Sequence, residues 1–164
     1  MSEAPTYVMD REFAAPPALV WRTFTEPDLL ARWYGPNVET VIHKLDVAPG
    51  GLWLNEMRKG DFSQRERMEF VEVVEPERLV WLHSMADADW NIAANPHMPD
   101  WPRVLLAIVT LEDLGVRTKL RLTWTPHEAT AAEVACFAGA MAGLDQGWGA
   151  GMAVIETLLA ELQA

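Results

Sequence analysis

Histidine and carboxylate side chains are the groups in this sequence that could carry acid–base chemistry. His83 alternates with Trp81 and Met85, which places the three side chains on one face of a strand. A lone histidine on an apolar face is more often a hydrogen-bonded core residue, but in a cavity it would orient a ligand or act as a base. Asp145 flanks an apolar helical stripe, about 60° from Trp148 around the helix axis. Two interpretations of Asp145 remain open: a carboxylate at the rim, or a cavity carboxylate that pairs with His83.

Aromatic and methionine side chains indicate a second kind of site, one for an apolar ligand. The chain holds eight tryptophans and eight methionines. A filled core uses tryptophan sparingly because its buried N–H needs a partner, whereas methionine adapts to irregular shapes. The alternative is that the same side chains simply fill the core. We predict a ligand-binding site on the faces that would turn toward a long helix, lined by Trp53, Met57, Met68, Trp81, His83, Trp124, Met141 and Trp148.

Other kinds of chemical site have little support in the sequence. It contains no nucleophile motif, phosphate-binding loop, dinucleotide fingerprint or zinc-ligand spacing. The acidic residues and histidine of Ala86–Pro102 are too irregularly spaced for a metal site. Because a loop this long in a compact domain often acts as a lid, we expect this segment to form one, with Trp90 and Trp101 capping an opening. We predict no catalytic residue, no metal and no cofactor. One group of charged residues is interpreted as a solvated face: Glu56, Arg58, Glu66, Arg67 and Glu69.

The composition limits the partners of the chain. Its 164 residues suit one domain, predicted over residues 1–164. A net charge of -11 argues against a nucleic-acid partner and against an anionic membrane surface. Cys136 is the only cysteine and is interpreted as a small buried hydrophobe. Met1–Asp10 does not have the pattern of a signal peptide, so we expect a cytoplasmic location.

The last third of the chain predicts a long helix with one burying face. Its large apolar residues stay within about 40° of one line on a helix. Within Val134–Ile155, Asp145 disfavours the alternative of a membrane span. The interior glycines weaken a helix by about 1 kcal/mol each, so another element must hold it. Of these glycines, Gly147 and Gly151 lie near the burying face, where they would permit close approach of a sheet or leave room for a ligand. The apolar stripe consists of Phe137, Met141, Leu144, Trp148, Met152, Ile155, Leu159 and Leu162.

The middle of the chain predicts the sheet that holds this helix. A first strand at Tyr7–Phe13 is followed by two short helices, which begin at Pro17 and are divided by Pro27. Strand-like alternation then recurs between short turns, which makes the sheet antiparallel. The prediction is an α+β fold in which a curved antiparallel sheet wraps around a long C-terminal helix. The further strands are expected at Val38–Val47, Leu52–Arg58, Arg67–Val74, Leu79–Met85, Val104–Glu112 and Thr118–Thr125.

Four stretches, in order, resemble a known family. They are residues 13–33 (FAAPPALVWRTFTEPDLLARW), Asp46–Trp53, Val73–Val80 and Gly147–Gly149. The chain is similar over Tyr7–Leu162 to proteins homologous to the C-terminal domain of the activator of the heat-shock chaperone ATPase. That family belongs to the START and birch-pollen-allergen-like helix-grip superfamily. The resemblance implies a cavity between the sheet and the long helix, but it carries over no catalytic residues. Ala86–Pro102 departs from the shorter connection expected of the family.

Three functions are compatible with these observations. The leading hypothesis is a binding protein for a hydrophobic, aromatic or polycyclic small molecule. The second is an enzyme of cyclase or hydrolase type that uses the same cavity, with His83 or Asp145 as the proton carrier. The third is a co-chaperone-like module that binds a heat-shock chaperone and raises its ATPase rate. The sequence leaves open whether the protein is a monomer or a homodimer.

Overall fold

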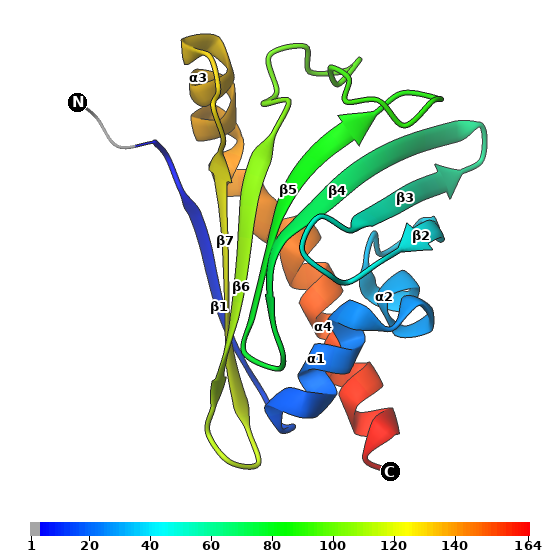
Figure 1. Ribbon diagram of the computed structural model, residues 1–164, viewed down its shortest axis with the longest axis vertical. Helices are drawn as coiled ribbons and strands as arrows, with labels where there is room; N and C mark the ends of the chain where they lie inside the picture. The colour runs from blue at the N-terminus through cyan, green and yellow to red at the C-terminus, as the bar shows by residue number, and fades with distance from the viewer. Residues whose placement is uncertain (1–3) are drawn as a thin grey trace.

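The computed structural model of the chain describes residues 4–164 (Figure 1). Residues 1–3, which begin the predicted domain and the segment considered for a signal peptide, lie outside the described residues. The secondary structure runs in the order β1 (Tyr7–Phe13), α1 (Pro17–Thr25), α2 (Pro27–Trp33), β2 (Glu39–Leu45), β3 (Leu52–Lys59), β4 (Phe62–Val74), β5 (Arg78–Ala86), β6 (Leu105–Asp113), β7 (Thr118–Pro126), α3 (Ala131–Ala140), the 3-10 turn η1 (Met141–Gly143) and α4 (Leu144–Leu162).

The seven strands form one antiparallel sheet in the order β1-β7-β6-β5-β4-β3-β2. The sheet curves, and α4 crosses its concave side from the α3 end toward α1 and α2 (Figure 1). Register irregularities between Ile42 and Lys44 and between Phe70 and Glu72 contribute to this curvature. The predicted α+β helix-grip fold, with two short helices after the first strand, is confirmed.

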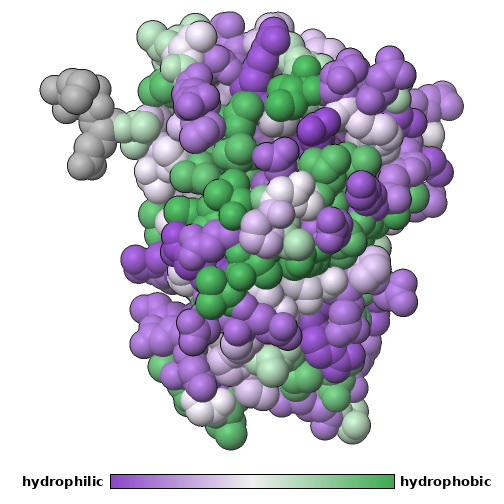
Figure 2. Space-filling model, viewed as in Figure 1, coloured by the Kyte–Doolittle hydropathy of each residue, from purple (hydrophilic) through white to green (hydrophobic). Residues whose placement is uncertain are grey.

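Alternation of side chains explains which face of the sheet is the inner one. In β7, Leu120, Leu122 and Trp124 are buried, whereas Lys119 and Arg121 between them are exposed. Because side chains alternate along a strand, the apolar set of each strand turns toward α4. Figure 2 shows the molecule in the same view, with apolar side chains gathered in a band across the middle of the visible face.

Strand β4 begins five residues earlier than the predicted strand. Its first part, from Phe62 to Glu66, is mostly polar and was not expected to be strand. All of it pairs with β3, and Arg65 and Glu66 also pair with β5. Glu66 faces Asn55 across one pairing and Met85 across the other. The extension matters for the site because it brings Glu66 into the middle of the sheet.

The predicted C-terminal helix is interrupted by η1. The backbone leaves α-helical geometry at Ala140 (φ -93°, ψ -12°) and Gly143 (φ -91°, ψ -8°). Glycine favours a break here because it weakens a helix interior. A capping box of Thr130 and Glu133 starts α3 as a helix in its own right. The long helix is therefore α4 alone, and among residues 4–164 no helix has the length and apolar character needed to span a membrane.

The glycines of this segment have different neighbours. A Cβ at Gly151 would lie 3.1 Å from both the ring and the carbonyl oxygen of Trp33, so this glycine lets α4 approach α2 rather than the sheet. A Cβ at Gly139, Gly143, Gly147 or Gly149 would meet no atom within 4 Å. Of these, Gly143 and Gly147 border a pocket beside the helix, so the structure offers room for a ligand there.

Candidate functional site

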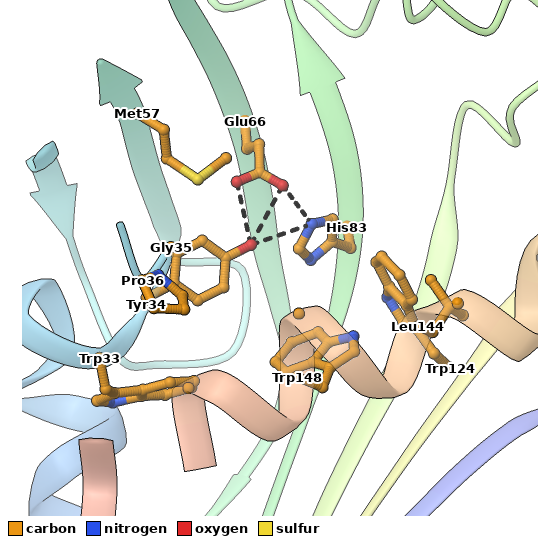
Figure 3. Close-up of a pocket in the computed structure, with 13 residues that line it drawn as sticks. Trp33, Tyr34, Gly35, Pro36, Met57, Glu66, His83, Trp124, Leu144 and Trp148 are labelled. Atoms are coloured by element: carbon orange, nitrogen blue, oxygen red, sulfur yellow. Dashed lines mark hydrogen bonds and ion pairs between the residues drawn. The ribbon is translucent and has the colours of Figure 1, made fainter. Parts of the chain in front are cut away.

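A pocket of about 240 Å³ lies between the concave face of the sheet, the start of α4 and the connection from α2 to β2 (Figure 3). The elements that form it come from both ends of the chain and from the central strands. Its walls consist of Trp33, Tyr34, Gly35, Pro36, Met57, Glu66, His83, Trp124, Gly143, Leu144, Gly147, Trp148 and Gly151.

Aromatic rings form most of one side of this pocket. The ring of Trp148 lies 5.6 Å from that of Trp124 and 6.2 Å from that of Tyr34, in both cases nearly edge to face. Tyr34 also contacts Trp33, with ring centroids 5.8 Å apart. These rings are held by the end of α2, by β7 and by α4, and each is buried. Such a wall favours a flat apolar ligand.

A hydrogen-bond network forms the polar end of the pocket (Figure 3). The hydroxyl of Tyr34 donates to both carboxylate oxygens of Glu66, at 3.0 and 3.1 Å. His83 Nε2 lies 2.7 Å from Glu66 Oε2 and 3.3 Å from the Tyr34 hydroxyl. Burial of Tyr34, followed by the adjacent charge of Glu66, raises the pKa of the phenol well above its ordinary value. Tyr34 therefore stays a neutral donor.

The tautomer of His83 follows from its second neighbour. The indole N–H of Trp81 lies 3.2 Å from His83 Nδ1, so this ring nitrogen accepts a hydrogen bond. A neutral imidazole then carries its proton on Nε2, where it donates to Glu66. The hydrogens of Tyr34 and His83 thus both point at Glu66.

In the part of the chain that the structure describes, Glu66 has no positively charged partner. Its side chain is 7 % exposed, and its one ion-pair neighbour among residues 4–164 is His83. Among the residues that line the pocket, Glu66 is the one with a formal charge, and neither Lys nor Arg contributes to the wall. The site therefore combines a buried carboxylate with aromatic rings.

A second pocket, of about 380 Å³, adjoins the first. The two share a wall that consists of Glu66, His83, Trp124, Gly143 and Leu144. The second pocket continues toward the segment between β5 and β6, which contributes Asn95, Met98, Trp101 and Pro102. The carboxylate and the imidazole thus separate two spaces.

The eight residues predicted to bind a ligand divide into two groups. Met57, His83, Trp124 and Trp148 line the first pocket, and two of them, His83 and Trp124, also line the second. The other four line neither pocket: Trp53, Met68 and Trp81 are buried in the core behind the wall, and Met141 in η1 packs half-buried against the core. Contact of the first group with a ligand stays a prediction.

Tyr34 and Glu66 were missed by sequence reasoning. The interpretation of Glu66 as part of a solvated face is wrong, since the residue points inward from β4. Its alternation with Met68, two residues later, was the available signal. Glu56 of the same group is also buried, on the opposite face, where Arg58, Ser63 and His43 bond to its carboxylate.

Asp145 lies apart from His83. Its carboxylate accepts a hydrogen bond of 2.5 Å from the hydroxyl of Tyr7 in β1, and the residue is exposed. Burial of Tyr7, together with Asp145, raises the pKa of the phenol. The hypothesis of an Asp145–His83 pair is therefore wrong, because Glu66 holds the position beside the imidazole.

The segment between β5 and β6 places its two tryptophans on opposite faces of the sheet. Trp101 packs against Trp124, at 5.9 Å between ring centroids, and borders the second pocket. Trp90 lies beneath the guanidinium of Arg65, at 4.7 Å, on the face away from Glu66. The prediction that both cap an opening is thus wrong for Trp90. Within residues 4–164 no three His, Cys, Asp or Glu side chains gather as a metal site would require.

Comparisons with known proteins relate this geometry to a family. A family model described as activator of Hsp90 ATPase homolog 1-like protein matches residues 14–160. A comparison with curated protein sequences gives no match.

Solved structures of bacterial proteins have the same fold. Protein Ms6760 from Mycobacterium smegmatis is 25% identical, with a TM-score of 0.78 over 95% of this chain and 91% of that one. A protein from Arthrobacter aurescens is 24% identical, with a TM-score of 0.79 over 96% and 87%. Protein NE0264 from Nitrosomonas europaea is 24% identical, with a TM-score of 0.74 over 99% of both chains.

Proposed function

The chain belongs to the activator of Hsp90 ATPase homolog 1-like family, and we propose that its function within this family is to bind a hydrophobic, aromatic small molecule. The ligand would lie in the pocket between the sheet and α4. Its flat apolar part would contact Tyr34, Trp124 and Trp148, and its polar end would point toward Glu66.

The observation that carries this proposal is a hollow against the aromatic wall, which the side chains of the chain leave unfilled. Trp124 and Trp148 face a hollow bordered by Gly143 and Gly147, where side chains of ordinary size would fill the space. Pockets for small ligands usually measure about 300–1,000 Å³. The first pocket, of about 240 Å³, is slightly smaller than this range, and the adjoining second pocket, of about 380 Å³, lies within it.

An unpaired polar group in the pocket wall supports the same conclusion. Among residues 4–164, four buried side-chain atoms of Trp53, Asn55 and Trp124 have no hydrogen-bond partner. Of these three residues, Trp124 lines the pocket with its unpaired indole N–H. Buried polar atoms normally find a partner in protein or in ordered water, so such a group favours a site that something else completes.

Filling the pocket from α4 tests the proposal. Gly147→Leu would place a side chain in the open space, whereas Gly149→Leu, two residues on, also meets open space but does not border the pocket. The probes are 1-naphthylmethanol and 1-naphthylmethylamine. For each probe we expect Gly149→Leu to bind with the affinity of the wild type, and Gly147→Leu to bind at least about tenfold more weakly than the wild type. Isothermal titration calorimetry measures the dissociation constants, and circular dichroism checks the fold of both variants.

Two results would contradict the proposal. One is that the wild type binds neither naphthyl compound. The other is that the two leucine variants bind alike, which would place any binding elsewhere on the molecule. Native mass spectrometry of the protein as purified would complement the titration by revealing a small molecule that it retains.

A further inference from the structure

We propose that the ligand of this pocket is an organic cation, an arylalkyl ammonium compound whose charged nitrogen pairs with Glu66. The inference rests on the proposed function and adds the charge class of the ligand. Three observations carry it: the isolation of the carboxylate, the direction of the hydrogen bonds around it, and the rings beside it.

The first observation is the contrast between two buried glutamates. On the outer face of the sheet, Glu56 has Arg58 at 2.9 Å and Arg65 at 3.9 Å. On the inner face, Glu66 is equally buried but has no arginine or lysine within ion-pair distance among residues 4–164. A buried carboxylate without an opposite charge is costly, and a bound cation would remove that cost.

The second observation concerns which hydrogen bonds remain to be made. A carboxylate offers about four acceptor positions, and Tyr34 and His83 occupy only part of them. Tyr34 and His83 both donate their hydrogens to Glu66, and His83 Nδ1 already accepts a hydrogen bond from the indole N–H of Trp81. Within the network of Glu66, Tyr34 and His83, the positions left open are therefore acceptors, which suit an ammonium group because it only donates. The pocket wall also holds a buried donor that is unpaired among residues 4–164, the indole N–H of Trp124. The negative charge of Glu66 disfavours a carboxylate or phosphate.

The third observation is the aromatic surround. The electron-rich faces of Trp and Tyr attract cations within about 6 Å of the ring centre. Tyr34, Trp124 and Trp148 line the same pocket as Glu66: Tyr34 reaches its carboxylate, Trp124 lies beyond His83, and Trp148 lies on α4 across the pocket (Figure 3). Neither Lys nor Arg lines either pocket, and the net charge of -11 adds a general attraction for cations.

Three naphthyl compounds of similar size test the inference, since the polar groups that they carry at the same ring position differ in charge. They are 1-naphthylmethylamine, a cation at pH 7, the neutral 1-naphthylmethanol, and the anion 1-naphthoate. We expect the wild type to bind the amine at least about tenfold more tightly than the alcohol, and the anion most weakly, by isothermal titration calorimetry.

A matched pair of variants assigns this preference to Glu66. Glu66→Gln keeps the shape of the side chain and removes its charge, so we expect the amine and the alcohol to bind within about threefold of each other. Glu69→Gln changes the net charge by the same amount from the outer face of the same strand, where Glu69 has no ion pair among residues 4–164. It should keep the preference for the amine.

The possible results are distinguishable. If the wild type binds none of the three compounds, the proposed function itself fails. If it binds the alcohol as tightly as the amine, the function stands and the cation is excluded. Retention of the preference in Glu66→Gln would also overturn the inference. Should this variant fail to fold, the ranking of the three compounds by the wild type still decides.

Discussion

Glu56 and Glu66 lie on adjacent strands and are both buried, yet they face opposite sides of the sheet and meet different partners. Arg58, Ser63 and His43 surround the carboxylate of Glu56 with donors. Among residues 4–164, the donors to Glu66 are the neutral side chains of Tyr34 and His83. The first glutamate therefore belongs to a structural ion pair, whereas the second is the one that we propose to pair with a ligand.

Glu56 should make stability depend on pH. The Arg58 guanidinium, followed by Ser63 and His43, holds the pKa of the Glu56 carboxyl far below its ordinary value of 4.5. A carboxylate with a lowered pKa stabilises the fold above its unfolded pKa, and this contribution is lost as the pH falls through the folded pKa. We expect Glu56→Gln to lower the free energy of unfolding by about 2 kcal/mol at pH 7, and by less as the pH falls below 4.5.

Urea unfolding at pH 7 and at progressively lower pH, followed by tryptophan fluorescence, measures this difference. Glu75→Gln is the control, because Glu75 is exposed and has no ion pair in the described part of the chain. A gap between wild type and Glu56→Gln that stays constant with pH would contradict the assignment.

Some residues of the pocket could be predicted from the sequence and others could not, for physical reasons. His83 and Trp124 could be placed near a cavity because strand alternation marks inward faces, and Trp148 because it lies in a helical apolar stripe. Glu66 could not, since a charged residue in a polar stretch looks solvated until its strand partners are known. Tyr34 follows the last residue of α2, where no periodicity indicates its direction.

At the scale of elements, the break between α3 and α4 decides which rings meet. Phe137 in α3 packs against Trp101 and Trp124, at 5.6 and 6.2 Å between ring centroids. Trp148 in α4 instead contacts Trp124 from the pocket side and Tyr34. Periodicity predicted a single helix because the apolar stripe continues through η1. It could not show that the two halves share Trp124 but differ in their second partner, which is Trp101 for Phe137 and Tyr34 for Trp148.

A pair of alanine variants tests the close approach of α4 to α2. Gly149→Ala meets open space and should raise the free energy of unfolding by about 0.5–1 kcal/mol, the usual gain in a helix. At Gly151 the added methyl would lie 3.1 Å from the ring and the carbonyl oxygen of the buried Trp33. We expect Gly151→Ala to be less stable than Gly149→Ala by at least about 1 kcal/mol. Equal gains in urea unfolding would show that Trp33 moves aside freely.

The strands were easier to predict than the helices. Segments with clean alternation, such as Thr118–Thr125, have close counterparts in the structure. The sequence did not predict the polar beginning of β4, because this part is a strand through its pairing with neighbouring strands rather than through its composition.

At the scale of the whole molecule, the pocket exists only when distant segments come together. Its wall joins the end of α2 near residue 33 to α4 near residue 150, with three central strands and β7 between them. An unfolded chain cannot reproduce such a site, so a ligand should stabilise the complete fold.

This coupling can be measured. At a free concentration of 1-naphthylmethylamine about one hundred times its dissociation constant, we expect the free energy of unfolding to rise by about 2.7 kcal/mol. Glu66→Gln at the same concentration should gain much less. If the wild type gains nothing although calorimetry detects binding, the compound would have to bind outside the folded core.

The rings around the pocket also form a continuous series, from Phe24 through Trp33 and Tyr34 to Trp148, Trp124 and Trp101. Two indoles in this series, Trp124 and Trp148, are 5.6 Å apart and almost perpendicular. Where their transition dipoles are not at right angles, indoles this close couple electronically and give a paired signal in circular dichroism. Trp124 and Trp148 would then report optically on a ligand at this wall.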